Sequence, residues 1–323
     1  MLQSNVLTND LVCCPICGNE LVLETNYYLC ADKDCESRFP LVDKIPILIN
    51  ESKSIFEIKS FVNRKETTFI SDKGKTAGLK KIINKLIPSI NANFISQELL
   101  IQFSDIINSN SKKKTILIIG GSVSGIGMDN FLSLNKSHNI IISDVSLGGD
   151  VNMICDCHSL PLKNNSIDVV IIQAVLEHVL DPYLCVSELT RVLKEGGLVL
   201  SEVPFIQQLH QDPFDFTRFT HIGHRWLFRD YEHIDSGVVC GSGMGLAWSL
   251  RGFVKTLFTN ILLQKISIKL VHILFFWIKY FDFRKHSELR GGFETASSIY
   301  FIGKLSSYTI NFNELVDYYN ERK

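Results

Sequence analysis

From Thr115 onward, short runs of Ile, Val and Leu alternate with helical patterns, and this alternation constrains the fold of the 323-residue sequence most strongly. Strands are predicted at TILIIG (115–120), NIIISD (139–144), VNMICD (151–156), SIDVVIIQ (166–173) and GGLVLSEVP (196–204). Continuously apolar strands need cover on both faces, which a parallel sheet flanked by helices provides. The sequence therefore predicts a doubly wound α/β domain.

Two later segments, IDSGVVCG (234–241) and SSIYFIGKL (297–305), are further strand candidates, separated by a long apolar insert at 245–285. The helix DPYLCVSELTRVLKEG (181–196) has Pro182 at its first turn and Gly196 after its predicted end. We expect seven strands over residues 115–305, mostly parallel, with the last one antiparallel.

The first 35 residues hold five of the nine cysteines. Cys14 and Cys17 form one pair and Cys30 and Cys35 a second, a spacing that can present four thiolates tetrahedrally to a structural Zn²⁺. The alternative is a cluster of free cysteines in a small β-unit. The other cysteines lie in apolar surroundings and give no disulfide framework, which is typical of a cytoplasmic protein.

Composition separates further regions. Residues 1–50 form the predicted zinc ribbon, and residues 306–323 a C-terminal tail. Residues 51–114 are richer in Lys, Ser and Asn and are predicted to be a linker with leading helices at GLKKIINKLIPSI (78–90) and FISQELLIQFSDIINS (94–109).

The first predicted strand of the α/β domain runs into a glycine-rich turn, ILIIGGSVSGIG (116–127). Glycines there allow positive φ and close approach of a ligand to the backbone. The pattern is one substitution from the dinucleotide fingerprint, and Asp144 lies where a ribose-binding carboxylate is expected. A glycine turn of this kind is also used only for packing, so it does not identify a ligand alone. A Walker-type phosphate loop is excluded, because no Lys-Ser or Lys-Thr closes the turn.

The segment MICDCHSLPLKNNSIDVVIIQAVLEHVLDPYLCVSELTRVLKEGGLVLSEVPF (153–205) closely resembles the central motifs of class I S-adenosylmethionine-dependent methyltransferases. Its pieces are an acidic residue followed by SLP, then N-x-S-I-D-V-V, LEHV-x-D-P and LK-x-GG. The N-terminal stretches LVCCPICGNEL, YYLCADKDC and RFPLVDKIPILI resemble the zinc ribbon found in front of many bacterial methyltransferases, which is similar to a small methyltransferase-activator protein. The resemblance implies a Rossmann-like methyltransferase fold, S-adenosylmethionine as cofactor and Zn²⁺ in the ribbon.

The resemblance also implies roles for individual residues. The turn would pack against the methionine half of the cofactor, Asp144 would accept from the ribose hydroxyls, and Asp156 from the adenine amino group. The implied cofactor-binding residues are Gly120, Gly121, Ser122, Gly125, Asp144, Asp156, Cys157, His158 and Gln173. One departure is Ile118, which stands where many family members carry an acidic residue near the cofactor's ammonium group.

Polar residues are crowded in EVPFIQQLHQDPFDFTRFTHIGHRWLF (202–228), past the fifth predicted strand. This stretch resembles bacterial methyltransferases of surface-polysaccharide biosynthesis that show H-x-x-P-x-D-F-x-R-F-T. We predict His210 as general base, with Asp215 and Arg218 orienting a small-molecule or glycan-precursor acceptor. The alternative is that Asp215 and Arg218 only brace the loop. Glu177 and His178 could face the same site, but His178 is interpreted as a contact at the start of a helix.

The formal charge is −1, from 33 basic and 34 acidic side chains, so no nucleic acid is expected as partner. No secretory signal is recognised and no run of eighteen uncharged apolar residues occurs, so no transmembrane helix is expected. The insert 245–285 is basic and apolar. One interpretation is peripheral contact with the inner face of the membrane; the favoured one is a lid or a homodimer interface. A non-catalytic scaffold that recruits a partner through the ribbon is the alternative function.

Overall fold

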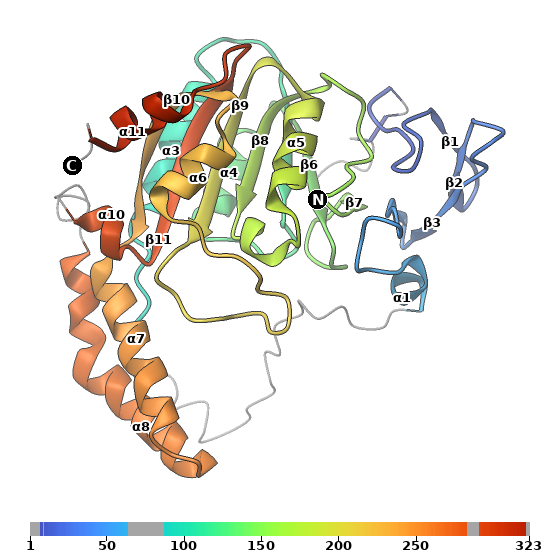
Figure 1. The fold of residues 1–323 in the computed structure, drawn as a ribbon. Helices are drawn as coiled ribbons and strands as arrows, with labels where there is room; N and C mark the ends of the chain where they lie inside the picture. Colours follow the sequence, from blue (N-terminus) through green and yellow to red (C-terminus); the bar gives the residue numbers. More distant parts are fainter. Residues whose placement is uncertain (1–6, 9, 64–86, 283–290, 321–323) are drawn as a thin grey trace.

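A seven-stranded sheet forms the centre of the computed structural model, which describes residues 7–8, 10–63, 87–282 and 291–320 (Figure 1). The strand order is β10-β11-β9-β8-β5-β6-β7. Its strands are β5 (Thr115–Ile119), β6 (Asn139–Asp144), β7 (Met153–Ile154), β8 (Ile167–Gln173), β9 (Leu193–Pro204), β10 (Tyr231–Cys240) and β11 (Ser298–Leu305). The pairings β5–β6, β5–β8, β6–β7 and β8–β9 are parallel, whereas β11 pairs antiparallel with both β9 and β10. The predicted sheet, with its antiparallel last strand, is confirmed.

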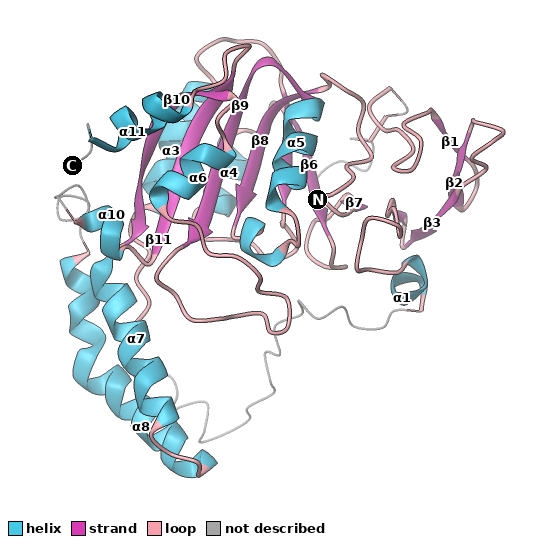
Figure 2. Cartoon of the chain, in the orientation of Figure 1, coloured by secondary structure: helices cyan, strands magenta, loops and turns pink. Residues whose placement is uncertain are grey.

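Helices cover both faces of this sheet (Figure 2). They are α3 (Ser96–Ile107) and α4 (Met128–Leu134) on one face, and α5 (Pro182–Val192) and α6 (His221–Leu227) on the other (Figure 1). The shorter elements α10 (Gly292–Thr295) and α11 (Phe312–Asn320) flank the β10 side. Side chains of β5 alternate between two buried clusters: Leu117 joins the one that includes α5, and Ile116 the one that includes α3 and α4. The sheet is therefore buried on both faces, as its apolar strands require.

Two element boundaries differ from the prediction. Helix α5 ends at Val192, because Leu193 is already extended and pairs in the β8–β9 ladder with Ile167. Gly196 therefore lies inside β9, at φ +71°, and not just past a helix. Strand β7 has two residues instead of the six expected, since only Met153 and Ile154 pair with the end of β6.

A small antiparallel sheet lies at the N-terminus, with the strands β1 (Leu21–Leu23), β2 (Tyr27–Cys30), β3 (Arg38–Val42) and β4 (Ile45–Pro46). Hydrogen bonds tie it to the large sheet's loops: Cys13 N donates to Pro161 O (3.0 Å) and Leu48 N to Ile154 O (2.8 Å). Buried side chains such as Phe39 belong to the same apolar cluster as residues of β5 and α5. The small sheet therefore shares a core with the rest of the protein.

Residues 51–63 continue from this sheet and include α1 (Ile58–Val62). The second predicted leading helix is present as α3. The first, at 78–90, lies largely outside the described residues.

The apolar insert forms a helical hairpin that projects from the α/β domain (Figures 1 and 2). It consists of α7 (Ser242–Thr256), α8 (Ile261–Phe275) and η2 (Phe276–Phe281). The continuous stretch Ile261–Phe281 is long and apolar enough to cross a membrane by length and composition, and almost none of it is buried. Lysines interrupt this stretch, so it holds no run of eighteen uncharged apolar residues, yet its overall hydropathy stays high. The expectation of no transmembrane helix stays a prediction.

Candidate functional site

A cavity of about 500 Å³ lies beyond the carboxyl ends of β5, β6 and β8. Strand β5 lies between β6 and β8. The chain adds β6 and β7 on one side of β5 and then crosses over to add β8 and β9 on the other. Strand β5 therefore marks the switch point at which open α/β sheets bind ligands. The volume is in the range of pockets that hold cofactors and small molecules.

The predicted cofactor residues gather at this edge. The cavity is lined by Gly120, Ser122, Asp144, Asp156, Cys157 and His158. Gly121, Gly125 and Gln173 line a smaller adjoining cavity of about 140 Å³, which shares Gly120 and Ser122 with the first. All nine residues therefore lie on one continuous surface.

The glycine turn leaves little room for side chains at its first two positions. Gly120 has φ +81°, and a Cβ atom there would lie 2.3 Å from Cγ2 of Val175. At Gly121 a Cβ atom would lie 2.3 Å from Cγ2 of Ile142. Gly125, in contrast, would meet nothing within 4 Å. The first two glycines are thus required by packing and conformation, and only the third faces open space.

Asp144 ends β6 and holds the turn. Its Oδ2 accepts a hydrogen bond from the backbone N of Ser122 at 2.8 Å. Burial raises the pKa of Asp144 above its ordinary value, although the backbone donors around it oppose that effect. A donor pair such as two hydroxyl groups in the cavity would favour its charged form.

Asp156 follows β7 and is held by three donors. Its Oδ2 accepts from Ser54 Oγ at 2.6 Å, and its Oδ1 from the backbone N (3.0 Å) and Nδ1 (2.6 Å) of His158. Burial disfavours the carboxylate, but these hydrogen bonds outweigh it, so the pKa of Asp156 is lowered. A ligand amino group would therefore meet a carboxylate that already has partners.

Sequence reasoning missed the segment 52–56, which it assigned to a linker. Ser52, Lys53, Ser54, Ile55 and Phe56 all line the large cavity. Phe56 also lies 5.9 Å, between ring centroids, from Phe214 of the loop after β9. No local pattern marks this segment, because its position depends on how the small sheet packs against β7.

Strand β9 carries, beside the end of β8, a further carboxylate that sequence reasoning did not single out. Glu202 is in register with Gln173, accepts from Ser96 Oγ at 3.3 Å, and has its pKa raised to about 7 by burial. Ile118, the departure named from the sequence, is 3% exposed and packs in the core beneath α3 and α4.

The loop between β9 and α6 brings His210 to the short helix η1 (Leu176–His178). The Nε2 atoms of His210 and His178 each lie 3.7 Å from Oε1 of Glu177. The Glu177 carboxylate raises the pKa of His210. His178, interpreted from sequence as a contact at the start of a helix, lines the large cavity.

Asp215 and Arg218 form a two-pronged ion pair that closes this loop. Asp215 also accepts from the backbone N of His210 at 2.7 Å, and Arg218 donates to the carbonyls of Gln207 and Gln208. Neither residue lines the cavity. The geometry is that of a brace, the alternative stated for this pair.

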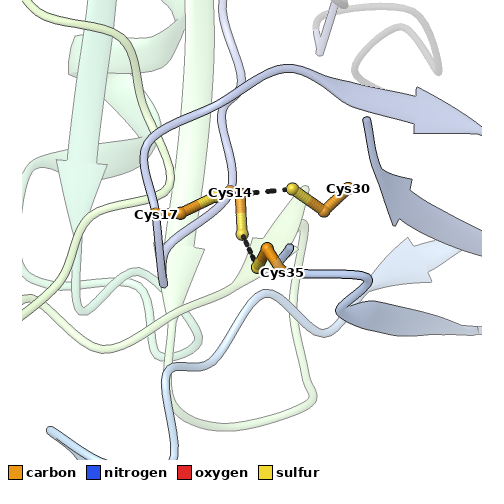
Figure 3. A group of neighbouring side chains, drawn as sticks. All are labelled: Cys14, Cys17, Cys30 and Cys35. Carbon is orange, nitrogen blue, oxygen red and sulfur yellow. Dashed lines mark hydrogen bonds between the residues drawn. The ribbon is translucent and has the colours of Figure 1, made fainter. Parts of the chain in front are cut away.

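The four N-terminal cysteines converge on one point (Figure 3). Sγ of Cys14 lies 3.8 Å from that of Cys35, and Sγ of Cys17 lies 3.4 Å from that of Cys30. Zinc–sulfur bonds of about 2.3 Å in a tetrahedron place neighbouring sulfurs about 3.8 Å apart. The donor set and spacing therefore fit a closed zinc site.

Residues 131–201, less than a quarter of the chain, match the model of a family described as a methyltransferase domain. A stretch of 68 residues is 40% identical to an uncharacterized 37.1 kDa protein in transposon Tn4556 of Streptomyces fradiae, and covers 21% of this chain and 18% of that protein. The chain thus matches less than a fifth of the length of this curated relative.

Among solved structures, the chain is similar to a complex containing the Haloferax volcanii Trm112 methyltransferase activator (TM-score 0.38, 16% identity, 60% of this chain and 84% of that one). It is also similar to the YcgJ protein of Bacillus subtilis (TM-score 0.38, 14%, 65% and 99%) and to a Haemonchus contortus N-methyltransferase in complex with S-adenosylhomocysteine (TM-score 0.39, 15%, 68% and 55%). These likenesses are too remote to indicate a substrate. The strand order gives a Rossmann-like fold, and residues 131–201 of it match the methyltransferase-domain model.

Proposed function

We propose that this protein is an S-adenosylmethionine-dependent methyltransferase acting on a small-molecule or glycan-precursor acceptor. The observation that carries the proposal is the cavity at the switch point. There the Gly120 turn meets the carboxylate of Asp144, which lies within the matched region 131–201. When bound, the cofactor supplies an activated methyl group.

The chain's own residues would hold and orient that cofactor. Asp144 accepts from ribose hydroxyls, the Gly120 turn admits the methionine half, and the backbone of Cys157 and His158 contacts the base. Asp156 accepts hydrogen bonds from His158 and Ser54 and so holds in place the residues that would surround the adenine base. Residues 52–56 exclude water from the cavity, which favours correct positioning of donor and acceptor.

On the acceptor side we propose that His210 contributes from the loop that Asp215 and Arg218 hold in place. Asp215 and Arg218 act as positioning residues, because their contacts are with the loop backbone. The general-base role of His210 stays a prediction. We also propose that the four-cysteine site binds structural Zn²⁺. The proposed acceptor is an intermediate of surface-polysaccharide biosynthesis.

The replacement Asp144→Ala will weaken binding of S-adenosylmethionine and S-adenosylhomocysteine. Loss of a charged acceptor for two hydroxyl groups is worth about 3 kcal/mol, or about 100-fold in Kd. Isothermal titration calorimetry of the zinc-loaded protein measures this directly. Asp144→Asn, which keeps an oxygen for the Ser122 backbone donor, separates loss of charge from collapse of the turn.

Glu195→Gln is the matched control, since Glu195 is an exposed carboxylate at the start of β9, on the opposite edge of the sheet. It should bind both compounds as the wild type does. The proposed function fails if the wild type binds neither compound, or if both Asp144 variants bind as tightly as the control. Either result would favour the non-catalytic scaffold that recruits a partner through the ribbon.

A further inference from the structure

We propose that Glu177, His178 and His210 form a second metal site, for a divalent transition-metal ion, in the wall of the large cavity. The site is separate from the four-cysteine cluster and uses nitrogen and oxygen donors. Three features of the side chains support this site: a buried carboxylate without a hydrogen-bond donor, two imidazoles beside it and an opening to the cavity.

The first feature is the carboxylate of Glu177. Its side chain is completely buried, and no described residue donates a hydrogen bond to either of its oxygens. A buried carboxylate without donors is strongly unfavourable unless a cation accompanies it. The backbone does not let it withdraw, because Glu177 O accepts hydrogen bonds from the N atoms of Phe216 and Thr217.

The second feature is the orientation of the two imidazoles. Nδ1 of His178 is hydrogen-bonded to the carbonyl of Phe214, which can only accept, so this nitrogen carries the proton and Nε2 offers a lone pair. Nδ1 of His210 lies between Oδ2 of Asp215, at 3.4 Å, and Nη2 of Arg218, at 3.5 Å. Histidines that bind metals are usually held through the other ring nitrogen by a carbonyl or a carboxylate, as His178 is held by Phe214.

The three ligand atoms lie near one another and would have to move closer together to bind one metal ion. Both Nε2 atoms lie 3.7 Å from Oε1 of Glu177, and the three ligand atoms lie within 4.8 Å of one another. Bonds of about 2.1 Å from a tetrahedral ion would bring such atoms to about 3.4 Å. Two histidines and one carboxylate also leave coordination positions open.

The third feature is that the opening faces the cavity, which His178 and Gln211 both line. An ion there can bind an oxygen of an acceptor molecule and fix it at the cavity wall. The inferred acceptor therefore carries a hydroxyl or carboxylate oxygen. This assignment of the acceptor rests on the proposed function, whereas the metal site itself does not. With the ion bound, His210 is a metal ligand and not the general base.

The test uses Mn²⁺ on the full-length, zinc-loaded protein, because a thiolate site disfavours this ion. Electron paramagnetic resonance of free Mn²⁺ should show one ion bound per chain. Glu177→Gln, which keeps the shape and removes the charge, should weaken binding by about 10–100-fold or more. Glu195→Gln should bind as the wild type, and His178→Asn should weaken binding as Glu177→Gln does.

Failure to bind Mn²⁺ at millimolar concentration, or equal binding by Glu177→Gln and the wild type, would overturn the metal site. Thermal unfolding of each variant checks folding, and Glu177→Gln should not be less stable in the absence of metal. Calorimetry with S-adenosylhomocysteine is recorded on the same samples. Cofactor binding without Mn²⁺ binding contradicts the metal site alone, and the reverse contradicts the proposed function alone.

A second, independent inference concerns the hairpin of α7, α8 and η2. We infer that it docks on the surface of an anionic membrane. Both helices expose large apolar side chains, with Phe253 61%, Ile261 67% and Leu262 66% exposed. Others along the hairpin are Leu246, Leu257, Leu263, Ile266, Leu270, Ile273, Leu274, Trp277 and Phe281.

The charges of the hairpin favour an anionic partner. Residues 242–281 contain Arg251, Lys255, Lys265, Lys269 and Lys279 and no acidic residue. A basic amphipathic surface is attracted to anionic lipid, with its apolar face in the interfacial layer. A second copy of the same hairpin would bring like charges together, which argues against a homodimer through this face.

Co-sedimentation with vesicles tests this inference. The wild type should bind vesicles of phosphatidylcholine with phosphatidylglycerol and bind vesicles of phosphatidylcholine alone more weakly. The double replacement Lys265→Glu/Lys269→Glu should reduce binding to the anionic vesicles by about 30-fold or more. Lys33→Glu/Lys136→Glu, at two exposed lysines elsewhere, is the matched control and should reduce it far less.

Equal binding by the two double variants would overturn the membrane inference, as would no binding by the wild type. Light scattering of the same proteins tests whether a second copy of the chain covers the hairpin instead. A dimer that dissociates when Leu262 is replaced by Gln, without vesicle binding by the wild type, assigns the face to a second copy.

Discussion

Replacing Cys17 and Cys30 with serine will unfold the N-terminal sheet and remove one zinc ion per chain. A structural zinc site of four thiolates contributes about 10–16 kcal/mol of apparent binding free energy, which a sheet of this size cannot replace by burial. The affected core includes Phe39 and Leu48, which pack in the same cluster as the large sheet. Hydrogen exchange should therefore show lost protection in residues 10–50 and a lower thermal midpoint for the whole chain.

Cys240→Ala is the control, because Cys240 is a buried thiol far from the cluster in sequence and lies in β10. It should keep its zinc and its protection in residues 10–50. Retention of folded β1–β4 in the double serine variant, or an unchanged metal content by elemental analysis, would contradict a structural zinc site.

Gly120→Ala will abolish measurable binding of the cofactor and destabilise the fold by about 3 kcal/mol. The residue has φ +81°, which costs a residue with a Cβ atom about 1–2 kcal/mol, and the new methyl group would overlap the side chain of Val175 at 2.3 Å. Urea unfolding gives the change in free energy of unfolding, and calorimetry with S-adenosylhomocysteine gives the change in binding.

Gly125→Ala belongs to the same turn and meets nothing within 4 Å. It should leave the free energy of unfolding within about 0.5 kcal/mol of the wild type. If Gly120→Ala were as stable as Gly125→Ala and bound cofactor normally, the turn would not have the tight conformation described above.

The sheet and the polar groups at its edge could be predicted because they depend on local patterns. Apolar runs of β5, β6 and β8 specify buried parallel strands, and the residue that ends each strand then lies at the same edge. The positions of Gly120, Asp144 and Gln173 at strand ends follow from this pattern, whereas their roles toward a cofactor were implied by the family resemblance. The cysteine spacing likewise predicts a convergence of four thiolates that the structure shows.

The remaining parts of the site depend on contacts between segments far apart in the sequence. Ser54 reaches Asp156 only because the small sheet packs against β7, and His210 meets Glu177 only because the loop after β9 folds back onto η1. The cover of the apolar insert could not be predicted for a related reason. An apolar stripe has the same pattern whether a core, a second chain or a membrane covers it.

The hydrogen bond from Ser54 to Asp156 connects the two parts of the molecule in a way that has a thermodynamic consequence. Under the proposed function, zinc at the cysteines would order the sheet from which Ser54 continues, and a cofactor in the cavity would contact the same segment, 52–56. Linkage is reciprocal, so each of the two bound species would then tighten the other by an equal factor. Loss of zinc would lower the affinity for the methyl donor together with the stability of β1–β4.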